Sequence, residues 1–432
     1  MIWNETKECI SRDELANIQS KRLVKTVDRV YHNVEYYRKK MQKVGLEPGD
    51  IRGIEDLYKL PYTTKDDLRI TYPFGLFASP MSEIVRTHAS SGTTGKATVV
   101  GYTRHDIEIW KECVARAFSQ AGITRNDRMQ IAYGYGLFTG GLGAHYGAEN
   151  LGAMVVPMST GNTKKLITMM KDFGVTAIAC TPSYLLHIAE VLEETGQIGD
   201  IRLRVAVCGA EPWTENMRKN IEAKLHIHAF DIYGLSEVMG PGVACDCEFH
   251  KGLHVNEDYF LPEIIDPKTL EPVGEGVTGE LVFTTLTKEG LPLLRYRTKD
   301  LTSIDYSPCE CGRTTARISR FKGRSDDMLI IRGVNVFPSQ IEAALLEMSG
   351  TTPHYMMIVD RQGSLDTLEV QVEVEERFFS DEIRELENLS KRIAHVIQNA
   401  IGLAVKVKLI EPKTLERSEG KAKHVIDRRI LV

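Results

Sequence analysis

The chain carries the stretch Ser90-Ser91-Gly92-Thr93-Thr94-Gly95-Lys96, a loop of small hydroxyl residues and glycines that ends in a lysine. Glycines let backbone N–H groups approach a polyphosphate closely, and Lys96 adds a positive charge that attracts the anion. The common phosphate loop, Gly-x-x-x-x-Gly-Lys followed by Ser or Thr, does not match, because Ser90 replaces its first glycine and Ala97 follows the lysine. The stretch therefore predicts a nucleotide-binding loop of another class.

Two further motifs follow along the chain, Tyr233-Gly234-Leu235-Ser236-Glu237 and Tyr296-Arg297-Thr298-Lys299-Asp300. A Ser/Thr/Gly loop alone is typical of surface turns, because those residues dominate turns. The three motifs in this order resemble the signature of the adenylate-forming superfamily, which includes acyl-CoA synthetases, adenylation domains and luciferases. The resemblance implies that the nucleotide is ATP and that the enzyme forms an acyl-adenylate.

Length and composition indicate a soluble globular protein. The 432 residues amount to about three usual domains, so we expect one large domain and a smaller one. The net charge of −5 gives no electrostatic basis for nucleic acid or an anionic membrane as a partner. Because no apolar run is typical of a signal peptide or a membrane helix, we expect a cytoplasmic location.

Short apolar runs rich in β-forming residues alternate with helical stretches after the loop, which favours a parallel sheet with helices on both faces. The predicted fold class is therefore α/β. We expect a large N-terminal domain, 1–326, that begins with a helical bundle, 1–60, and also contains a β-subdomain. Residues 327–432 are expected to form a small α+β domain, which the resemblance implies is mobile. The helical bundle is a candidate surface for a homodimer.

The superfamily reaction brings two anions together, the carboxylate of an acid and the triphosphate of ATP. By resemblance, Glu237 corresponds to the magnesium-binding carboxylate. Lys421, which ends Arg417-Ser418-Glu419-Gly420-Lys421, corresponds to the lysine that bridges the attacking carboxylate and the α-phosphate, with Lys423 as the alternative. Asp326 is the candidate hinge about which the small domain rotates between the two half-reactions, because a short polar residue at a domain boundary suits that role.

Other residues correspond to nucleotide contacts of the superfamily. Asp300 is expected to accept hydrogen bonds from the ribose hydroxyls, since an ionised carboxylate offers two acceptor oxygens. Tyr233 would lie against adenine, and Gly209-Ala210-Glu211-Pro212 would contact the adenine edge through its backbone, after a strand, where parallel sheets usually bind ligands. The residues expected to bind the nucleotide are Ser90, Ser91, Gly92, Thr93, Thr94, Gly95, Lys96, Gly209, Ala210, Glu211, Pro212, Asp231, Tyr233, Gly234, Ser236, Asp300 and Arg324.

The stretch Tyr133-Gly134-Tyr135-Gly136-Leu137-Phe138-Thr139-Gly140-Gly141 is the candidate wall of the acid pocket. Aromatic rings provide an apolar surface, and glycines allow close backbone approach. Tyr135, Phe138 and Gly140 are the pocket residues that we expect, and a core-packing role for either ring is the alternative.

Two tight cysteine pairs crowd soft ligands into turns, Cys245-Asp246-Cys247-Glu248-Phe249-His250 and Cys309-Glu310-Cys311. Tetrahedral zinc takes four such sulfur or nitrogen atoms. We expect a structural zinc site made by Cys247, His250, Cys309 and Cys311, with Cys245 or His254 as substitutes for His250. The alternative is four reduced thiols.

The runs Leu286-Thr287-Lys288-Glu289 and Asp326-Asp327-Met328-Leu329-Ile330-Ile331-Arg332-Gly333-Val334-Asn335-Val336-Phe337-Pro338 narrow the resemblance to the phenylacetate-coenzyme A ligase family. This family implies that ATP, Mg2+ and coenzyme A convert an aryl acetate, foremost phenylacetate, into its CoA thioester, with AMP and pyrophosphate as products. Ring-hydroxylated phenylacetate, indoleacetate and benzoate are alternative acids, because an apolar pocket separates them by only ~1–3 kcal/mol. Rival interpretations are an adenylation enzyme that loads a carrier-protein thiol and an adenylate-binding protein without catalysis.

Overall fold

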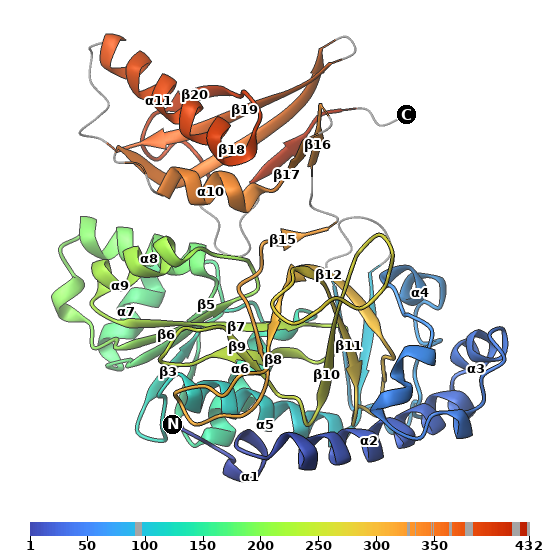
Figure 1. The fold of residues 1–432 in the computed structure, drawn as a ribbon. Helices are drawn as coiled ribbons and strands as arrows, with labels where there is room; N and C mark the ends of the chain where they lie inside the picture. The colour runs from blue at the N-terminus through green and yellow to red at the C-terminus, as the bar shows by residue number, and fades with distance from the viewer. Residues whose placement is uncertain are drawn as a thin grey trace. The chain divides into compact units, whose positions relative to one another are not determined.

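The computed structural model describes residues 1–90, 97–325, 329–332, 334–346, 348, 350–362, 365–375, 383–416 and 424–429. The chain forms two compact units (Figure 1). The first comprises Met1–Thr181, Gln197–Ala210 and Ile227–Arg320, and the second comprises Pro182–Gly196, Glu211–His226 and Phe321–Val432. Within the described ranges, no helix is both long enough and apolar enough to cross a membrane.

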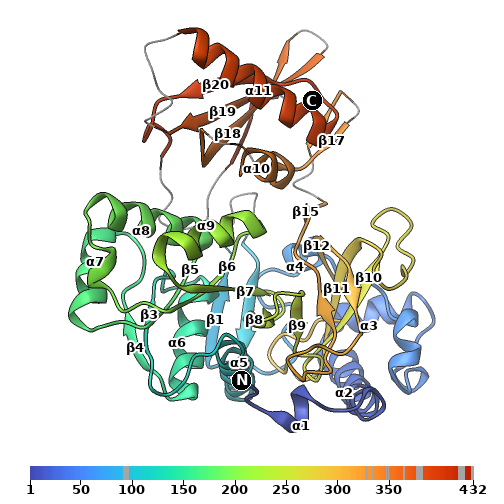
Figure 2. The ribbon, with the colours of Figure 1, turned by 60° about the vertical axis from the view of Figure 1, so that its left-hand side comes forward.

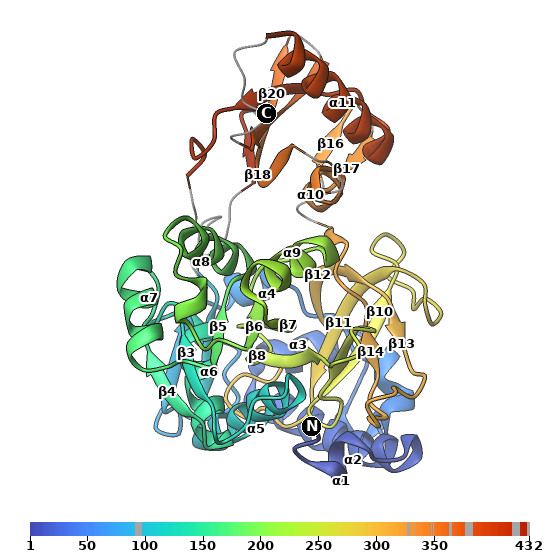
Figure 3. The ribbon, with the colours of Figure 1, turned by 90° about the vertical axis from the view of Figure 1, so that its left-hand side faces the viewer.

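The first unit begins with helices whose N-termini are capped by side chains. The Ser11 side chain accepts the Glu14 N–H at the start of α2, and Thr64 and Asp67 form a reciprocal capping box at the start of α4. α1 and α2 lie along the same side of the unit as α5 (Figure 3). The elements of this segment are α1 (Glu5–Glu8), α2 (Arg12–Asn33), α3 (Glu35–Gln42), η1 (Pro48–Asp50), η2 (Ile54–Lys59) and α4 (Lys65–Ile70).

A nine-stranded sheet forms the centre of the first unit, in the order β13-β14-β9-β8-β7-β6-β5-β3-β4. Strands β3 to β7 run parallel, and β8, β9, β14 and β13 continue the sheet in antiparallel pairs. The parallel strands β5 and β6 are buried along their whole length, as expected for strands covered on both faces. The strands are β3 (Arg128–Ile131), β4 (Met154–Pro157), β5 (Ala177–Cys180), β6 (Val205–Gly209), β7 (His228–Leu235), β8 (Gly240–Asp246), β9 (Leu253–Val255), β13 (Ile304–Asp305) and β14 (Arg317–Ile318).

Further elements flank this sheet. Helices α5 and α6 pack against each other and against β8 (Figure 2). Strand β11 pairs antiparallel with β10 and with β12, and β1 pairs with β2 in a separate hairpin. These elements, with the remaining ones of the first unit, are β1 (Arg86–Ala89), β2 (Val99–Tyr102), α5 (Arg104–Gln120), α6 (Thr139–Leu151), α7 (Thr163–Asp172), η3 (Ile198–Asp200), β10 (Phe260–Ile265), β11 (Gly279–Thr285) and β12 (Tyr296–Thr302).

The second unit has its own sheet, in the order β20-β19-β18-β21, and its own apolar core. Helix α11 contributes Ile393 and Ile397, which pack with Val370 and Val372 of β19. The elements are α8 (Pro182–Glu194), α9 (Glu215–Leu225), β15 (Gly323–Arg324), β16 (Leu329–Ile331), β17 (Val334–Val336), α10 (Pro338–Leu346), β18 (Thr351–Gln362), β19 (Leu365–Val374), α11 (Ile383–Ile401), β20 (Lys406–Ile410) and β21 (Val425–Asp427). The α/β class and a separate C-terminal domain, both predicted from the sequence, are confirmed.

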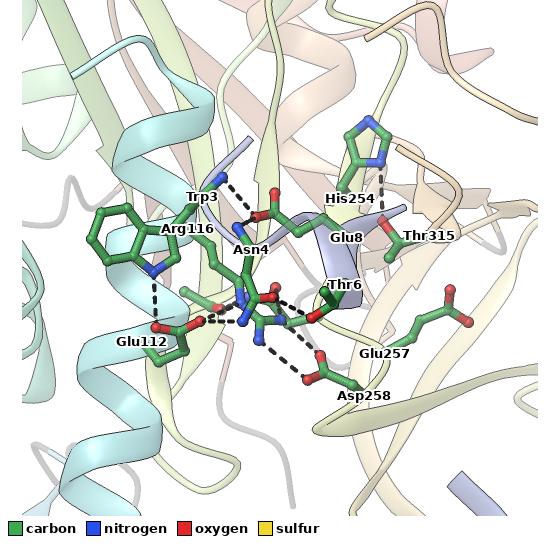
Figure 4. A network of polar contacts seen from close by, with 12 residues as sticks. Trp3, Asn4, Thr6, Glu8, Glu112, Arg116, His254, Glu257, Asp258 and Thr315 are labelled. Atoms are coloured by element: carbon green, nitrogen blue, oxygen red, sulfur yellow. Dashed lines mark hydrogen bonds and ion pairs between the residues drawn. The ribbon is translucent and has the colours of Figure 1, made fainter. Parts of the chain in front are cut away.

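A buried polar network attaches the N-terminal segment to α5 (Figure 4). Arg116, whose side chain is 2% exposed, donates to both carboxylate oxygens of Asp258, at 2.8 and 3.2 Å. Its Nε donates to Glu112, and the same carboxylate accepts the indole N–H of Trp3 at 2.8 Å. Because the charges at the centre of this network are out of water, each depends on its partner.

Asp258→Ala should lower the free energy of unfolding by about 3–5 kcal/mol, because it leaves the Arg116 guanidinium buried without its bidentate partner. Lys39→Ala is the matched control, since Lys39 pairs with Glu35 in an exposed ion pair worth about 0–1 kcal/mol. Urea titration followed by circular dichroism measures both values. Equal stability of the two variants would show that the buried pair contributes nothing.

Candidate active site

The Tyr233–Glu237 motif forms the end of β7 and the turn into β8. This turn is tight: a Cβ atom on Gly234 would lie 1.8 Å from the carbonyl oxygen of Gly240, so only glycine allows the two strands to meet. The Ser236 hydroxyl lies 3.0 Å from the Thr139 hydroxyl at the start of α6. Asp231 is buried within the same strand. The structure thus brings this motif to the carboxyl end of a parallel strand, where such sheets bind ligands.

The Glu237 side chain is nearly buried, with the residue 6% exposed. Its Oε1 accepts a hydrogen bond from the Thr98 hydroxyl at 3.3 Å, and the Lys65 ammonium lies 3.8 Å from the same oxygen. Neither contact is a close, bidentate pairing. A carboxylate in this setting offers the hard oxygen ligand that Mg2+ prefers.

The second and third motifs meet in the structure. The Tyr233 hydroxyl donates to Asp300 Oδ2 at 2.6 Å, which joins β7 of the central sheet to β12. The Asp300 N–H donates to the Thr298 hydroxyl at 3.0 Å, and Lys299 between them has a φ of 71°. The Tyr233 hydroxyl therefore orients the Asp300 carboxylate, and a carboxylate is the kind of acceptor that binds a diol such as ribose.

A buried lysine binds the main chain of the turn that carries Glu237. Lys288 is 1% exposed, and its Nζ donates to the carbonyl oxygens of Glu237 at 3.1 Å and Val238 at 2.9 Å. Burial lowers the pKa of Lys288 to about 8. In the sequence, Lys288 belongs to a family-specific run and has no expected role, because nothing in a short polar run shows that a lysine is buried.

The expected adenine turn begins where β6 ends. A Cβ on Gly209 would lie 2.1 Å from the carbonyl oxygen of Ile232, and Ala210 adopts a φ of 74°. Both features show that the chain leaves the sheet sharply at this point. In the second unit, Glu211, which precedes Pro212, accepts a hydrogen bond from the Ser183 N–H through its Oε1 at 2.7 Å. This carboxylate therefore caps the first turn of α8.

The base of the expected phosphate loop is closed by two hydrogen bonds. The Ser90 N–H donates to the Thr98 carbonyl, and the Thr98 N–H donates to the Ser90 hydroxyl, both at 3.0 Å. These bonds join the two ends of the segment that connects β1 to β2. The other expected loop residues, the hinge candidate Asp326 and the catalytic candidate Lys421 lie outside the described residues. Arg324 lies in β15 of the second unit.

The expected pocket residues lie immediately before and at the start of α6. Burial raises the pKa of Tyr135, whose hydroxyl lies 3.2 Å from His145 Nδ1. Phe138 is 44% exposed, so its ring lies outside the packed core. A Cβ on Gly140 would lie 2.4 Å from the Phe138 ring, so this glycine allows the ring to rest on the helix. The arrangement offers an aromatic surface beside Tyr133, whose ring centroid lies 6.4 Å from that of Phe138.

Three of the four expected metal ligands come together with a different histidine. Potential ligand atoms of four residues lie within 4.8 Å of one another, namely those of Cys247, His254, Cys309 and Cys311. The Sγ atoms of Cys247 and Cys309 are 3.8 Å apart, and Cys311 Sγ lies 3.4 Å from His254 Nε2. Hydrogen bonding from Cys247 lowers the pKa of the Cys311 thiol.

The expected His250 lies apart from this cluster and its place is taken by His254. His250 sits in the turn after Cys247, and its Nδ1 is 2.5 Å from Asp246 Oδ2. The antiparallel pairing of β8 with β9 places His254 opposite Cys245, so the chain returns to the cysteines one strand later. His254 Nδ1 lies 3.2 Å from the Thr315 hydroxyl, which leaves Nε2 directed at the sulfurs. Cys245 instead donates to the Ala117 carbonyl in α5.

Comparison with known proteins places the chain in a class. A family model described as AMP-binding enzyme matches residues 84–286, and the model of the AMP-binding enzyme C-terminal domain matches residues 333–429. The crystal structure of 2-hydroxyisobutyryl-CoA ligase in complex with 2-HIB-AMP is similar, with a TM-score of 0.93 at 29% identity, over 99% of this chain and 92% of that one. The fold and these matches define an AMP-binding enzyme of the acyl-CoA ligase type.

Curated relatives narrow the class further. The phenylacetate-coenzyme A ligase of Escherichia coli is 50% identical over 98% of this chain and 97% of its own length, and that of Thermus thermophilus is 48% identical over 99% and 100%. The chain belongs to the phenylacetate-coenzyme A ligase family. The family predicted from the sequence motifs is therefore confirmed.

Proposed function

We propose that this enzyme joins an aryl acetate, foremost phenylacetate, to coenzyme A through an acyl-adenylate and releases AMP and pyrophosphate. The observation that carries the proposal is the meeting of the motifs at one end of β7, where Glu237 and the Tyr233–Asp300 pair lie on and beside one tight turn. Relatives named phenylacetate-coenzyme A ligase, which are 48–50% identical over nearly the whole chain, support it. The carboxylate, hydroxyl and glycine groups are those that an ATP site requires.

The roles follow from the electrostatic problem of the reaction, which is the approach of two anions. Asp300 would accept hydrogen bonds from the ribose hydroxyls. Glu237 would bind Mg2+, because this ion prefers carboxylate oxygen ligands. Bound Mg2+ would neutralise phosphate charge. The loop 90–96 would surround the β- and γ-phosphates, and Lys421 would bridge the attacking carboxylate and the α-phosphate. After pyrophosphate leaves, residues 327–432 would rotate about Asp326 so that the CoA thiol can attack the acyl carbon.

The aromatic acid would lie against Tyr135, Phe138 and Gly140, with its carboxylate directed towards the α-phosphate. Loading of a carrier-protein thiol is the alternative outcome of the same adenylation chemistry. A cytoplasmic location, a homodimer through residues 1–60, and the absence of nucleic acid and membrane partners stay predictions from the sequence.

A screen of pyrophosphate release over aromatic acids tests the proposed reaction. With ATP and Mg2+, phenylacetate should give the highest kcat/KM, and added CoA should convert it into phenylacetyl-CoA, measured by mass spectrometry. Thioester formation on a carrier protein but not on CoA would favour the alternative, and no pyrophosphate release with any aromatic acid would contradict adenylation altogether.

Lys421→Ala should strongly slow adenylate formation while leaving thioester formation from supplied phenylacetyl-adenylate largely intact. The reason is that the ammonium would be needed only while negative charge gathers at the α-phosphate. Acid-dependent exchange of pyrophosphate with ATP measures the first step, and Lys423→Ala is the matched control. Equal loss in both half-reactions, or the larger loss in the control, would contradict the assignment.

We also propose that Cys247, His254, Cys309 and Cys311 bind a structural Zn2+. Three sulfurs and one imidazole nitrogen are a usual tetrahedral donor set, and a hydrogen bond on the other ring nitrogen, as from His254 to Thr315, is typical of ligating histidines. Four protein ligands leave no open position, so the ion would join the loop after β8, strand β9 and the loop before β14 without taking part in catalysis.

The purified chain should contain stoichiometric zinc by atomic emission. His254→Gln and Cys311→Ser should remove it and lower the unfolding temperature, because the metal contributes to folding. His250→Gln is the matched control and should retain zinc, since His250 pairs with Asp246. Loss of zinc in the His250 variant with retention in the His254 variant would overturn this ligand set.

A further inference from the structure

We propose that Lys288 is a positioning residue for the adenylation half-reaction. Its ammonium, together with the Tyr102 hydroxyl, holds the turn 236–239 by its main-chain carbonyls and so fixes the carboxylate of Glu237. The inference rests on the proposed role of Glu237 as the magnesium ligand. It adds a residue that does not touch the nucleotide and acts through the backbone of one that does.

The contacts account for every carbonyl of the turn. Lys288 Nζ donates to the oxygens of Glu237 and Val238, at 3.1 and 2.9 Å. The Tyr102 hydroxyl donates to the oxygen of Met239 at 2.9 Å and lies 3.4 Å from that of Ser236. Four consecutive carbonyls thus face two donors, and the Glu237 carboxylate accepts a hydrogen bond from the Thr98 hydroxyl.

The Lys288 ammonium is buried, and its direct hydrogen bonds are to main-chain carbonyls. Lys288 is 1% exposed, and within the described part of the chain no carboxylate lies within salt-bridge distance of it, although the Asp106 and Glu237 carboxylates attract its charge from further away. Its Nζ lies 4.7 Å from the centroid of the Tyr102 ring, which stacks on Trp110 at 5.0 Å. Carbonyl dipoles, a π face and the two nearby carboxylates therefore stabilise a cation whose burial is costly. An apolar side chain would avoid this cost but could not bind the turn.

The segment that carries Lys288 is itself fixed. The N–H groups of Glu289 and Gly290 donate to the two carboxylate oxygens of Asp106, at 2.7 and 2.8 Å. Asp106 belongs to the capping box at the start of α5. A Cβ on Gly290 would lie 2.6 Å from the carbonyl oxygen of Gly101, so the segment also packs tightly on β2. The lysine therefore transmits the position of α5 and β2 to the turn.

Loss of the ammonium should displace the turn more than it destabilises the fold. Two buried carbonyls would lose their donor, which is unfavourable unless the turn moves to find water. A shift of about 1 Å in a group that positions substrate can reduce a rate by roughly 10²-fold. Because only adenylation uses the cation held by Glu237, the two half-reactions should respond differently.

The test compares Lys288→Met with the wild-type enzyme in both half-reactions. Acid-dependent exchange of pyrophosphate with ATP should fall about 10²-fold and should require more Mg2+ for half-maximal rate. Thioester formation from supplied phenylacetyl-adenylate and CoA should change less than about threefold, as expected where positioning of the triphosphate is not needed. Glu289→Gln is the matched control in the same segment, because its side chain contacts Arg29 and Thr103 rather than the turn, and it should leave both rates unchanged.

Tyr102→Phe is the second variant and removes the other donor while keeping the ring. It should lower the exchange rate alone, by about tenfold, as loss of one buried hydrogen bond would. Equal losses in both half-reactions, or an unchanged exchange rate and Mg2+ requirement in folded Lys288→Met or Tyr102→Phe enzyme, would overturn the inference. Failure of the proposed function is separate: there the wild type shows no exchange with any aromatic acid, or Glu237→Gln exchanges at the wild-type rate.

Discussion

The turn between β7 and β8 can form only because backbone meets backbone there without side chains. Gly234 faces the carbonyl of Gly240 at a distance that excludes a Cβ, and the carbonyls that follow are bound from below by Lys288 and Tyr102. These two constraints determine the direction of the Glu237 carboxylate. In the same strand, the Tyr233 hydroxyl donates to Asp300, so the end of β7 carries both parts of the candidate site.

The other end of the same hairpin is fixed by different chemistry. Strand β8 ends at Asp246, next to Cys247, and the cysteine cluster joins this end to β9 and to the loop that carries Cys309 and Cys311. Nearby, the buried Glu8–Arg313 pair joins the N-terminal segment to that loop. A metal there would stiffen the hairpin without approaching the nucleotide, which agrees with a closed set of four ligands.

Sequence reasoning succeeded where the signal was local. Apolar runs after the loop predicted buried parallel strands, which the structure has at β3 to β6, and Tyr233 and Asp300, from two separate motifs, meet in a hydrogen bond. Sequence reasoning favoured His250, in the turn after Cys247, as the fourth ligand of the expected site and named His254 as a substitute, whereas antiparallel pairing brings His254 to the cysteines. It gave Lys288 no role because lysine is normally exposed, and only tertiary packing reveals its burial.

In the proposed function, the β7–β8 turn directs the Glu237 carboxylate at a divalent cation beside the nucleotide. The most direct measurement is a crystal structure with a non-hydrolysable ATP analogue and Mn2+, located by anomalous scattering. We expect the ion at about 2.2 Å from a Glu237 oxygen, as for hard cations with oxygen ligands, and ribose hydroxyls within about 3.2 Å of Asp300. An ion bound without Glu237, or a ribose away from Asp300, would contradict it.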